Sequence, residues 1–482
     1  MLSIVWERGL RGKAWRILRN FCKDLHASVK TRFGLTRDFK MEIGGRQGSR
    51  LTGRLFSKMM DVLAEELQPS GMGFLLSEAL QIVVLLWVDD VLSFAVGEKE
   101  QQEILKKVDE FATKHRLQWG HAKCNIMKVG EHNKNQSKNI WKLGHMQIEE
   151  TTAYKYLGDH ISNDGKNIKN IEARKIKTQA TTININSIAS TEILRKIETS
   201  VLLELHDKVT IPGLLANAES WSLLKSETNE IEKVEYQALR NMFDLPLHTP
   251  IPALIFTFGT LYTHFRIETR RLNYLHRILN RPDNHWTTQA FHILDEQNLG
   301  WAKTIKQTLR SLDLPTDLTT IKNKRPNEWK REVNEKIERK NKARLFEECH
   351  KMADGKKIRK TKTAHIVDPL SADTYSRMPI PELQHMTKQE TKTLIIARYK
   401  MLDCGVNFKG SKSTICPSCK KTDDEDHRLN HCTRFRDINH CDNEEKVNFD
   451  DIYSADTNVL KKIIEQIENV WNTRNAHGTI LQ

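Results

Sequence analysis

Two neighbouring aspartates stand at the end of an apolar run and could hold divalent cations. Residues Ile82–Val88 are apolar, Asp89 and Asp90 follow directly, and Val91–Val96 resumes the apolar character. A short continuous apolar run is consistent with a strand buried on both faces, so the pattern predicts a hairpin with two carboxylates at its tip. Carboxylate oxygens suit Mg²⁺, and phosphoryl transfer by two metal ions needs such ligands. Exposed turns often carry an Asp-Asp pair, so its place after a buried strand is what indicates a metal site.

A second polar motif precedes the helix that the pattern predicts over Leu51–Leu67. It reads Gly45, Arg46, Gln47 and Gly48. The glycines permit a tight turn and a close approach of the backbone to a ligand, and the two polar side chains could contact a phosphate or a base. Taken alone, the motif is only a polar turn before a helix.

The third motif is a cysteine and histidine cluster near the end of the chain. Cys416, Cys419, His427 and Cys432 follow the pattern C-x2-C-x7-H-x4-C, which is typical of a tetrahedral structural zinc site with no open position for water. Three nearby residues are alternatives for the last ligand: His431, His440 and Cys441. The carboxylates of Asp423–Asp426 are expected to be solvated. Four other cysteines show no partner pattern and are expected to be ordinary thiols: Cys22, Cys124, Cys349 and Cys404.

The elements that would position these residues follow from hydrophobic periodicity. Residues 1–130 predict mixed α/β structure, with helices over Leu10–Asp24, Leu51–Leu67 and Glu100–Arg116 and a strand over Asp38–Ile43. Short strands are expected around Tyr154–Ile161, and mostly helices follow. Three apolar stripes each predict one buried helix face. They comprise Leu194, Ile197, Val201 and Leu205; Leu272, Leu275 and Leu279; and Leu460, Ile463, Ile464, Ile467, Val470 and Trp471.

Composition indicates a basic globular protein. The 482 residues are 38% hydrophobic and 29% charged, with a net charge of +14, which favours a polyanionic partner such as nucleic acid. The segment Lys322–Lys362 holds sixteen Lys/Arg against seven Asp/Glu, and is either an exposed helix or linker or a phosphate-binding arm. Five arginines share one predicted helix and form either a solvated basic face or a nucleic-acid groove: Arg266, Arg270, Arg271, Arg277 and Arg281.

No apolar run approaches the ~20 residues of a membrane span, and no secretory signal is present. We therefore expect an intracellular protein, in the nucleus or cytoplasm.

The motifs in order resemble the reverse transcriptases of non-LTR (LINE-type) retrotransposons. The turn box continues through Leu51, Leu55 and Phe56, and the Val88-Asp89-Asp90 box follows some thirty residues later. Leu117–Lys123 resembles the next box of the family, with its lysine at Lys123. Tyr154–Gly158 resembles the primer-grip box before the thumb. The Cys/His cluster, with Asn407-Phe408 before it, resembles the CCHC knuckle that follows this reverse transcriptase.

This resemblance implies an RNA-directed DNA polymerase with RNA template and DNA primer or target as partners. It implies Mg²⁺ on Asp89 and Asp90 and a structural Zn²⁺ on the cysteine and histidine cluster. Lys123 would lie near the leaving pyrophosphate, although it could be one surface lysine among many. The nucleic-acid or nucleotide contacts implied are Arg46, Gln47, Gly48, Tyr154 and Tyr156. The two tyrosines could equally pack the junction between palm and thumb.

The resemblance also implies an α+β fold in five parts. They are a partial palm (1–130), a thumb-like region (131–235), a basic helical connection (236–404), a zinc knuckle (405–445) and an amphipathic C-terminal helix (446–482). The family's first palm box, which supplies a third metal-binding Asp, would precede the helix that starts near Leu2. We therefore expect an N-terminally truncated copy with impaired catalysis, or alternatively an inactive nucleic-acid-binding remnant. Ser49–Gly53 and Trp87 also depart from the usual family residues.

Overall fold

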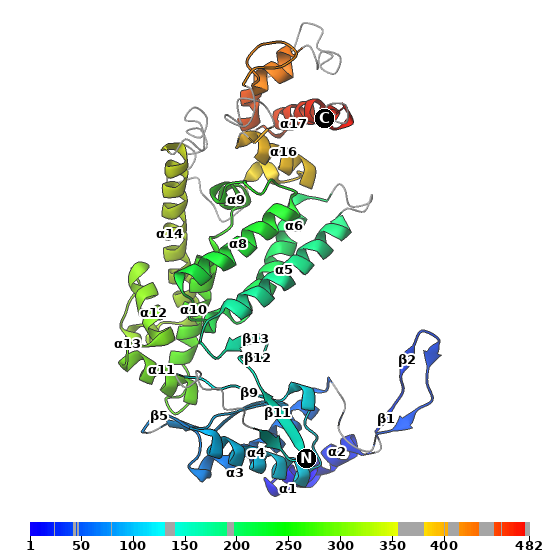
Figure 1. Cartoon of the computed structure of the whole chain (residues 1–482), viewed down its shortest axis with the longest axis vertical. Coiled ribbons are helices and arrows are strands. Elements are labelled where there is room, and N and C mark those ends of the chain that lie inside the picture. The colour runs from blue at the N-terminus through cyan, green and yellow to red at the C-terminus, as the bar shows by residue number, and fades with distance from the viewer. Residues whose placement is uncertain are drawn as a thin grey trace. The chain divides into compact units, whose positions relative to one another are not determined.

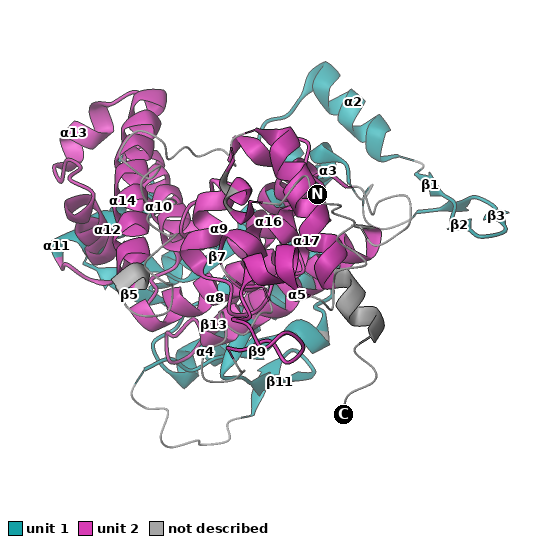
Figure 2. Ribbon diagram, turned by 90° about the horizontal axis from the view of Figure 1, so that it is seen from above, with its two compact units in different colours: residues 1–154, 283–296 teal, residues 155–282, 297–482 magenta. Residues whose placement is uncertain are grey.

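The structure is a computed structural model of the whole chain, drawn in Figure 1. The described residues are 1–23, 25–41, 45, 48–78, 80–130, 140–189, 197–354, 380–399, 401–402, 414–432, 448–454 and 456–477. They form two compact units, shown in Figure 2. Unit 1 comprises residues 1–154 and 283–296, and unit 2 comprises residues 155–282 and 297–482.

Unit 1 combines helices with small sheets. Its helices are α1 (Leu2–Glu7), α2 (Gly12–Cys22), α3 (Arg50–Leu67), α4 (Glu98–His115) and α11 (Trp286–Glu296). Its strands are β1 (His26–Ala27), β2 (Lys30–Thr31), β3 (Gly34–Leu35), β4 (Phe39–Lys40), β5 (Phe74–Ser77), β6 (Leu80–Ile82), β7 (Val84–Trp87), β8 (Asp90–Ser93), β9 (Asn125–Ile126), β10 (Trp141–Leu143) and β11 (Met146–Glu150). The antiparallel pairs are β1–β4, β2–β3, β5–β6, β7–β8 and β10–β11, and β9 adds to β11 in parallel.

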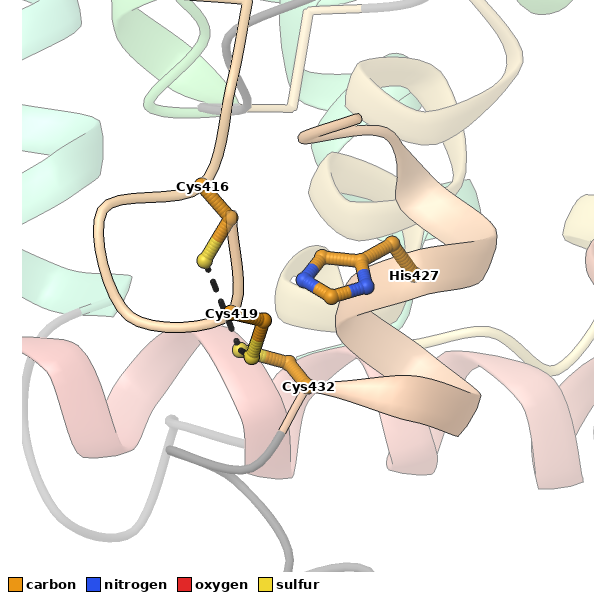
Figure 3. Close-up of side chains that lie close together, drawn as sticks. All are labelled: Cys416, Cys419, His427 and Cys432. Carbon is orange, nitrogen blue, oxygen red and sulfur yellow. Dashed lines mark hydrogen bonds between the residues drawn. The ribbon is translucent and has the colours of Figure 1, made fainter. Parts of the chain in front are cut away.

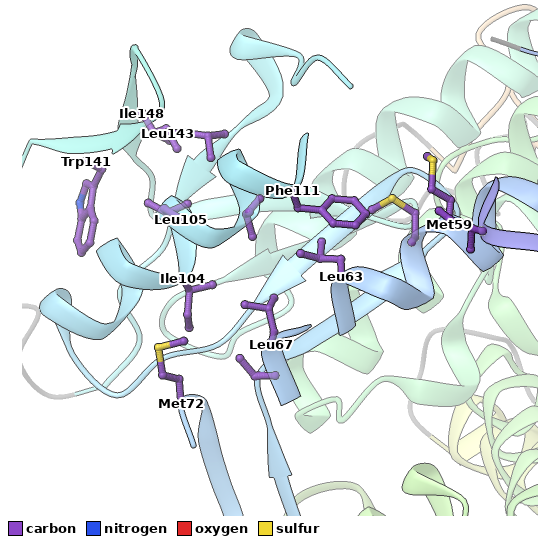
Figure 4. Close-up of a cluster of buried hydrophobic side chains, with 14 residues drawn as sticks. Met59, Leu63, Leu67, Met72, Ile104, Leu105, Phe111, Trp141, Leu143 and Ile148 are labelled. Atoms are coloured by element: carbon purple, nitrogen blue, oxygen red, sulfur yellow. The ribbon is translucent and has the colours of Figure 1, made fainter. Parts of the chain in front are cut away.

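Helices α3 and α4 enclose the core of unit 1 (Figure 4). Ser49 caps α3, since its Oγ accepts a hydrogen bond from the Thr52 amide at 3.5 Å. Acidic residues in the first turn of α4 and basic residues in its last turn both stabilise the helix dipole. The buried residues are Ile4, Met59, Met60, Leu63, Leu67, Met72, Val83, Ile104, Leu105, Val108, Phe111, Trp141, Leu143 and Ile148. The predicted helices over Leu51–Leu67 and Glu100–Arg116 are therefore confirmed as the elements of this core.

The composition of the apolar run Ile82–Val88 predicted one strand buried on both faces, and this prediction is wrong. It is divided between β6 and β7 at Val83, which is fully buried. Val84 and Leu86 pack against the core, whereas Trp87 is 62% exposed. Helix α3 packs against β7, whose residues Val84 and Leu86 contact the core. The strand predicted over Asp38–Ile43 is also shorter, since β4 has two residues.

Unit 2 is mostly helical. The chain enters it through β12 (Ala153–Tyr156), which pairs with β13 (Asp159–Ser162), as expected around Tyr154–Ile161. The helices are α5 (Ile168–Ala189), α6 (Thr199–Leu205), α7 (Ile211–Leu214), α8 (Lys225–Met242), α9 (Ile251–Phe258), α10 (Thr263–Leu279), α12 (Gly300–Ser311), α13 (Leu318–Asn323), α14 (Pro326–Asp354), α16 (Lys388–Arg398) and α17 (Thr457–His477). Short helical turns include η5 (His206–Thr210), η6 (Ala218–Ser220), η8 (His427–His431) and η10 (Phe449–Tyr453).

Helix α14 corrects the interpretation of Lys322–Lys362 as an exposed helix or linker. Six of its residues are buried at spacings of four: Trp329, Val333, Ile337, Asn341, Leu345 and Cys349. Four residues advance a helix by one turn plus about 40°, so this stripe winds around α14. Successive turns therefore face different neighbours, namely α10 and α9. The Trp329 indole donates a hydrogen bond to the Leu272 carbonyl at 3.0 Å.

The other apolar stripes have mixed outcomes. Leu272, Leu275 and Leu279 are buried on α10, and Leu460, Ile463, Ile464, Ile467 and Val470 are buried on α17, so both predicted stripes are confirmed. The stripe through Val201 is wrong, since Val201 is 42% exposed and Leu202 is fully buried. Helix α6 begins only at Thr199, so Ile197 lies outside it, and Leu194 lies outside the described residues.

Candidate metal centres and nucleic-acid contacts

Asp89 and Asp90 lie at the tip of an antiparallel hairpin, as predicted. Strand β7 pairs with β8 so that Trp87 faces Asp90 across a two-residue connection of Val88 and Asp89. Both carboxylates belong to exposed residues. Residues directly opposite each other project to the same side of a sheet, so Asp90 lies on the open side with Trp87. The adjacent pair Leu86 and Val91 packs against the core on the other side.

The turn at this tip holds its valine in a costly conformation. Val88 has φ +54°, the left-handed region that a β-branched residue rarely adopts. Left-handed geometry costs an L-residue roughly 1–2 kcal/mol. Such strain concentrates at functional sites, where the surrounding structure keeps it in place. Here, the two flanking strands hold the turn and present the adjacent carboxylates at its end.

Tyr154 and Lys123 lie close together in unit 1. The Tyr154 hydroxyl donates a hydrogen bond to the Lys123 carbonyl at 2.6 Å. Burial raises the pKa of Tyr154, and the negative charge of Asp90 acts in the same direction. Tyr154 is therefore within electrostatic reach of Asp90. The Lys123 residue is exposed, and its observed contact is made by the backbone. The side-chain role that the resemblance implied stays a prediction.

The two glycines of the motif, Gly45 and Gly48, are described, and Gly48 lies in a turn just before α3. Gly48 has φ +83°, which favours glycine. A Cβ atom on Gly45 would lie 2.5 Å from Cγ2 of Thr52, so a side chain at this position would require the Thr52 side chain to shift. Arg46 and Gln47 lie outside the described residues, and their predicted contacts stay predictions.

Tyr156 lines a groove of about 500 Å³ in unit 2. The hairpin β12–β13, the start of α5 and the turn η6 form its walls, and Trp221 and Tyr274 add aromatic surface. The groove floor is fixed by Arg174, which is buried and pairs with Asp159 at 2.5 Å. The indole of Trp221 donates to the same carboxylate at 3.1 Å. Sequence analysis singled out only Tyr156, because the other walls come from distant segments.

Cys416, Cys419, His427 and Cys432 come together as the spacing predicted (Figure 3). One ligand atom from each lies within 4.8 Å of all the others. The sulfur of Cys432 is 3.8 Å from that of Cys416 and 3.7 Å from that of Cys419. A tetrahedron with Zn–S bonds of ~2.3 Å has edges of ~3.8 Å. The group could therefore hold a zinc ion, although none is shown.

Local hydrogen bonds build this cluster. The Cys416 amide donates to the Lys421 carbonyl at 2.8 Å, and the Lys420 amide donates to the Cys416 carbonyl at 2.9 Å. These bonds close a tight turn that sets two sulfurs side by side. The turn η8 then returns His427, whose Nε2 is buried without a hydrogen-bond partner among the described residues. A buried unpaired nitrogen is costly, and a metal ion would satisfy it.

The acidic residues between the two halves of the cluster are not all solvated, which corrects the expectation for Asp423–Asp426. Asp423 is buried and accepts two hydrogen bonds of 2.6 Å from Arg428, which is also buried. Arg428 also lies over the Trp471 ring at 5.9 Å, joining the cluster to α17. Glu425 is buried as well. The alternative ligands His440 and Cys441 lie outside the described residues, whereas His431 lies outside the four-residue group.

The arginines of α10 form neither a solvated basic face nor an open groove. Arg271 is buried and donates to the Trp221 carbonyl at 2.6 Å. Arg270 donates to the Leu215 carbonyl at 2.9 Å, and Arg266 pairs with Asp207 at 3.1 Å. These three side chains therefore tie α10 to neighbouring segments of unit 2. Only Arg277 is well exposed among those whose contacts are described, and Glu219 lies 3.9 Å from it.

Comparison with known families gives one match. Residues 10–161 match the family model of the reverse transcriptase (RNA-dependent DNA polymerase). The match spans less than a third of the chain and contains the hairpin carboxylates, Lys123, Tyr154 and Tyr156. This part of the chain is therefore a reverse-transcriptase-like domain, and a helical region follows it. No curated protein matches the sequence. Within the described residues, no helix is both long and apolar enough to cross a membrane.

Proposed function

We propose that this chain is a reverse-transcriptase-like protein of a non-LTR retrotransposon, whose family activity is RNA-directed DNA synthesis. One observation carries the proposal. The paired carboxylates stand at the open tip of β7–β8, inside the segment that matches the reverse transcriptase model. The order of the boxes and the cluster at Cys416–Cys432 support the non-LTR type.

The donor set at the hairpin fits a magnesium site in part. Asp89 and Asp90 are exposed and offer carboxylate oxygens. This suits Mg²⁺, because the ion binds few protein ligands and keeps several waters and substrate phosphates in its shell. When bound, the metal would stabilise charge on the transferring phosphate. The protein's own contribution is to fix the two carboxylates side by side on a strained, well-supported turn. Among the described residues, no further His, Cys, Asp or Glu completes a metal-binding group with them.

The Cys/His cluster is proposed to be a structural zinc knuckle. Three thiolates and one imidazole fill a tetrahedral shell, so no position is left for substrate or water. Thiolate ligands require a reducing environment, which supports a nuclear or cytoplasmic location. The five-part division at residues 130, 235, 404 and 445 also stays part of this proposal, as do the nucleic-acid contacts of Arg46, Gln47, Gly48, Tyr154 and Tyr156.

Primer extension on an RNA template with Mg²⁺ tests the proposal. We expect weak synthesis by this chain, because two carboxylates support the transition state less well than three. Any synthesis should vanish in Asp90→Asn. Asp61→Asn is the matched control, because Asp61 is a half-buried carboxylate on α3 that pairs with Lys58 at 2.8 Å. Equal loss in both variants would contradict a special role for the hairpin.

A second candidate function is an inactive nucleic-acid-binding remnant. The chain's net charge of +14 favours it, and five cations fall within residues 356–362, which extend beyond α14. Each phosphate contact contributes a log–log salt slope of ~0.7–0.9. Replacing these five cations with glutamine should lower the slope by about 3.5–4.5 if this segment binds phosphate. Binding with that slope, combined with complete absence of extension, would favour the remnant.

A further inference from the structure

Four exposed apolar side chains of unit 1 lie together on one antiparallel ribbon, and one of them, Phe33, is the most exposed apolar side chain among the described residues of this unit. We define the arm as residues Leu25–Met41, which include β1, β2, β3 and β4. Every residue from Ser28 to Lys40 is exposed. Figures 1 and 2 both draw the arm as a hairpin that extends away from the helices of unit 1. Its exposed apolar residues are Val29 at 52%, Phe33 at 85%, Leu35 at 71% and Phe39 at 51%.

The arm is ordered by its own hydrogen bonds rather than by a core. The Val29 amide donates to Oγ1 of Thr36 at 2.9 Å, and the Thr36 amide donates to the Val29 carbonyl at 3.0 Å. At the tip, Oγ1 of Thr31 donates to the Gly34 carbonyl at 2.9 Å and accepts from the Phe33 amide at 3.1 Å. These bonds fix the tip loop, and the Phe33 ring beside it is exposed.

The charge of the arm indicates the class of partner that this surface would bind. Its sequence holds four Lys/Arg and one Asp, a net charge of +3 in seventeen residues. Cations and apolar side chains lie next to one another on the arm. Lys30, for example, lies directly opposite Leu35 on the neighbouring strand. The Arg32 guanidinium lies 4.5 Å from the centre of the Phe33 ring. Cations beside outward-facing aromatic rings are the combination that binds single strands, through phosphate contacts and base stacking.

We propose that the arm binds single-stranded RNA, with bases stacking on Phe33 and phosphates contacting Arg32 and Arg37. A duplex offers the same phosphates but few unstacked bases, so the exposed ring favours a single strand. The choice of RNA over DNA rests on the proposed function, because RNA is the template of a reverse transcriptase. The binding itself needs neither the hairpin carboxylates nor the zinc cluster.

The test measures binding of the full chain to three fluorescent probes, a 20-nucleotide single-stranded RNA, the same sequence as DNA, and the RNA duplex. Phe33→Ala should weaken binding to the single-stranded RNA about five-fold or more, because stacking on one aromatic side chain contributes at least that much. Duplex affinity should stay unchanged. Phe346→Ala is the matched control, because Phe346 is a 42% exposed phenylalanine of α14.

The phosphate contacts are tested separately. Arg32→Gln combined with Arg37→Gln should lower the salt slope for the single strand by about 1.4, at ~0.7 for each contact. Lys58→Gln with Lys106→Gln removes the same charge from α3 and α4 and should leave the slope intact. The binding assay contains no nucleotides and measures no synthesis, so a failed extension assay leaves this result unaffected.

Three outcomes would overturn the proposal. Unchanged RNA affinity in Phe33→Ala, with unaltered melting, would exclude stacking. An equal loss for the duplex would show that Phe33 does not act by stacking on unpaired bases, and a loss confined to the DNA probe would assign the arm to DNA. Light scattering of the arm variants is the last measurement. A variant that changes only the oligomeric state would show that the arm is an interface between copies of this chain.

Discussion

Removal of one sulfur from the Cys/His cluster should release zinc and unfold the surrounding segment. The perturbation is Cys419→Ser, which replaces a thiolate by a poor zinc ligand. Zinc binding contributes roughly 10–16 kcal/mol to the folding of zinc-finger peptides. Ordinary folded structure is stable by ~0.1 kcal/mol per residue, so the nineteen residues 414–432 with zinc bound should be stable by only about 2 kcal/mol in all. Because the metal contribution is several times larger, its loss should leave this segment unfolded.

The assay combines metal analysis with hydrogen exchange of the full chain. The parent should carry one zinc, and the variant should carry none and exchange rapidly over residues 414–432. Exchange in α4 should not change, because that helix belongs to the core of unit 1. Cys124→Ser is the control, since Cys124 is half-buried in unit 1 and lies outside the cluster. A parent without zinc, or a variant that keeps it, would refute the reasoning.

Three further predictions concern the turn, the basic helix and a buried carboxylate. Val88→Gly should raise the free energy of unfolding by up to ~1 kcal/mol in urea titrations, because glycine adopts φ +54° freely; a decrease would mean that the valine side chain packs. Arg271→Gln should lower the melting temperature, at a cost of ~1–3 kcal/mol from the unpaired Trp221 carbonyl, yet leave the salt slope of nucleic-acid binding unchanged. Burial pushes the pKa of Glu232 up, but the hydrogen bond and charge of His264 more than offset this and lower it. A lowered carboxyl pKa stabilises the fold above the ordinary value of about 4.5 and loses that effect as pH falls through the folded-state pKa. Glu232→Gln should therefore flatten the decline in unfolding free energy below pH ~4.5, and a decline identical to the parent's would contradict this.

The sequence did not predict the surroundings of side chains that can lie equally well in water or against protein atoms. Arg266, Arg270 and Arg271 are long, flexible cations on one helix, and their periodicity is the same whether they meet water, phosphate or carbonyl oxygens. Their actual partners are separated from them by about fifty residues in the chain. Asp423 differs from them, since its partner Arg428 is only five residues away, but the sequence did not show that both side chains are buried.

Helix α14 shows a further limit of periodicity. Its charged composition indicated exposure, but a stripe with a spacing of four residues buries one side chain in every turn. Because four residues exceed one helical turn of 3.6 residues, such a stripe moves around the helix and does not stay on one face. It becomes interpretable only when α9 and α10 are seen to contact different parts of the helix.

The sequence by itself determined the features that depend on near neighbours in the chain. The hairpin at Asp89 and Asp90, the turn before α3 and the Cys416–Cys432 cluster each need only local spacing, because backbone geometry converts that spacing directly into distance. Tertiary structure alone decided which faces are covered. It left Trp87 exposed, buried Arg271 and built the groove beside Tyr156 from distant segments. The physical reason is that burial depends on partners remote in sequence, whereas a turn or a ligand pair is specified within a few residues.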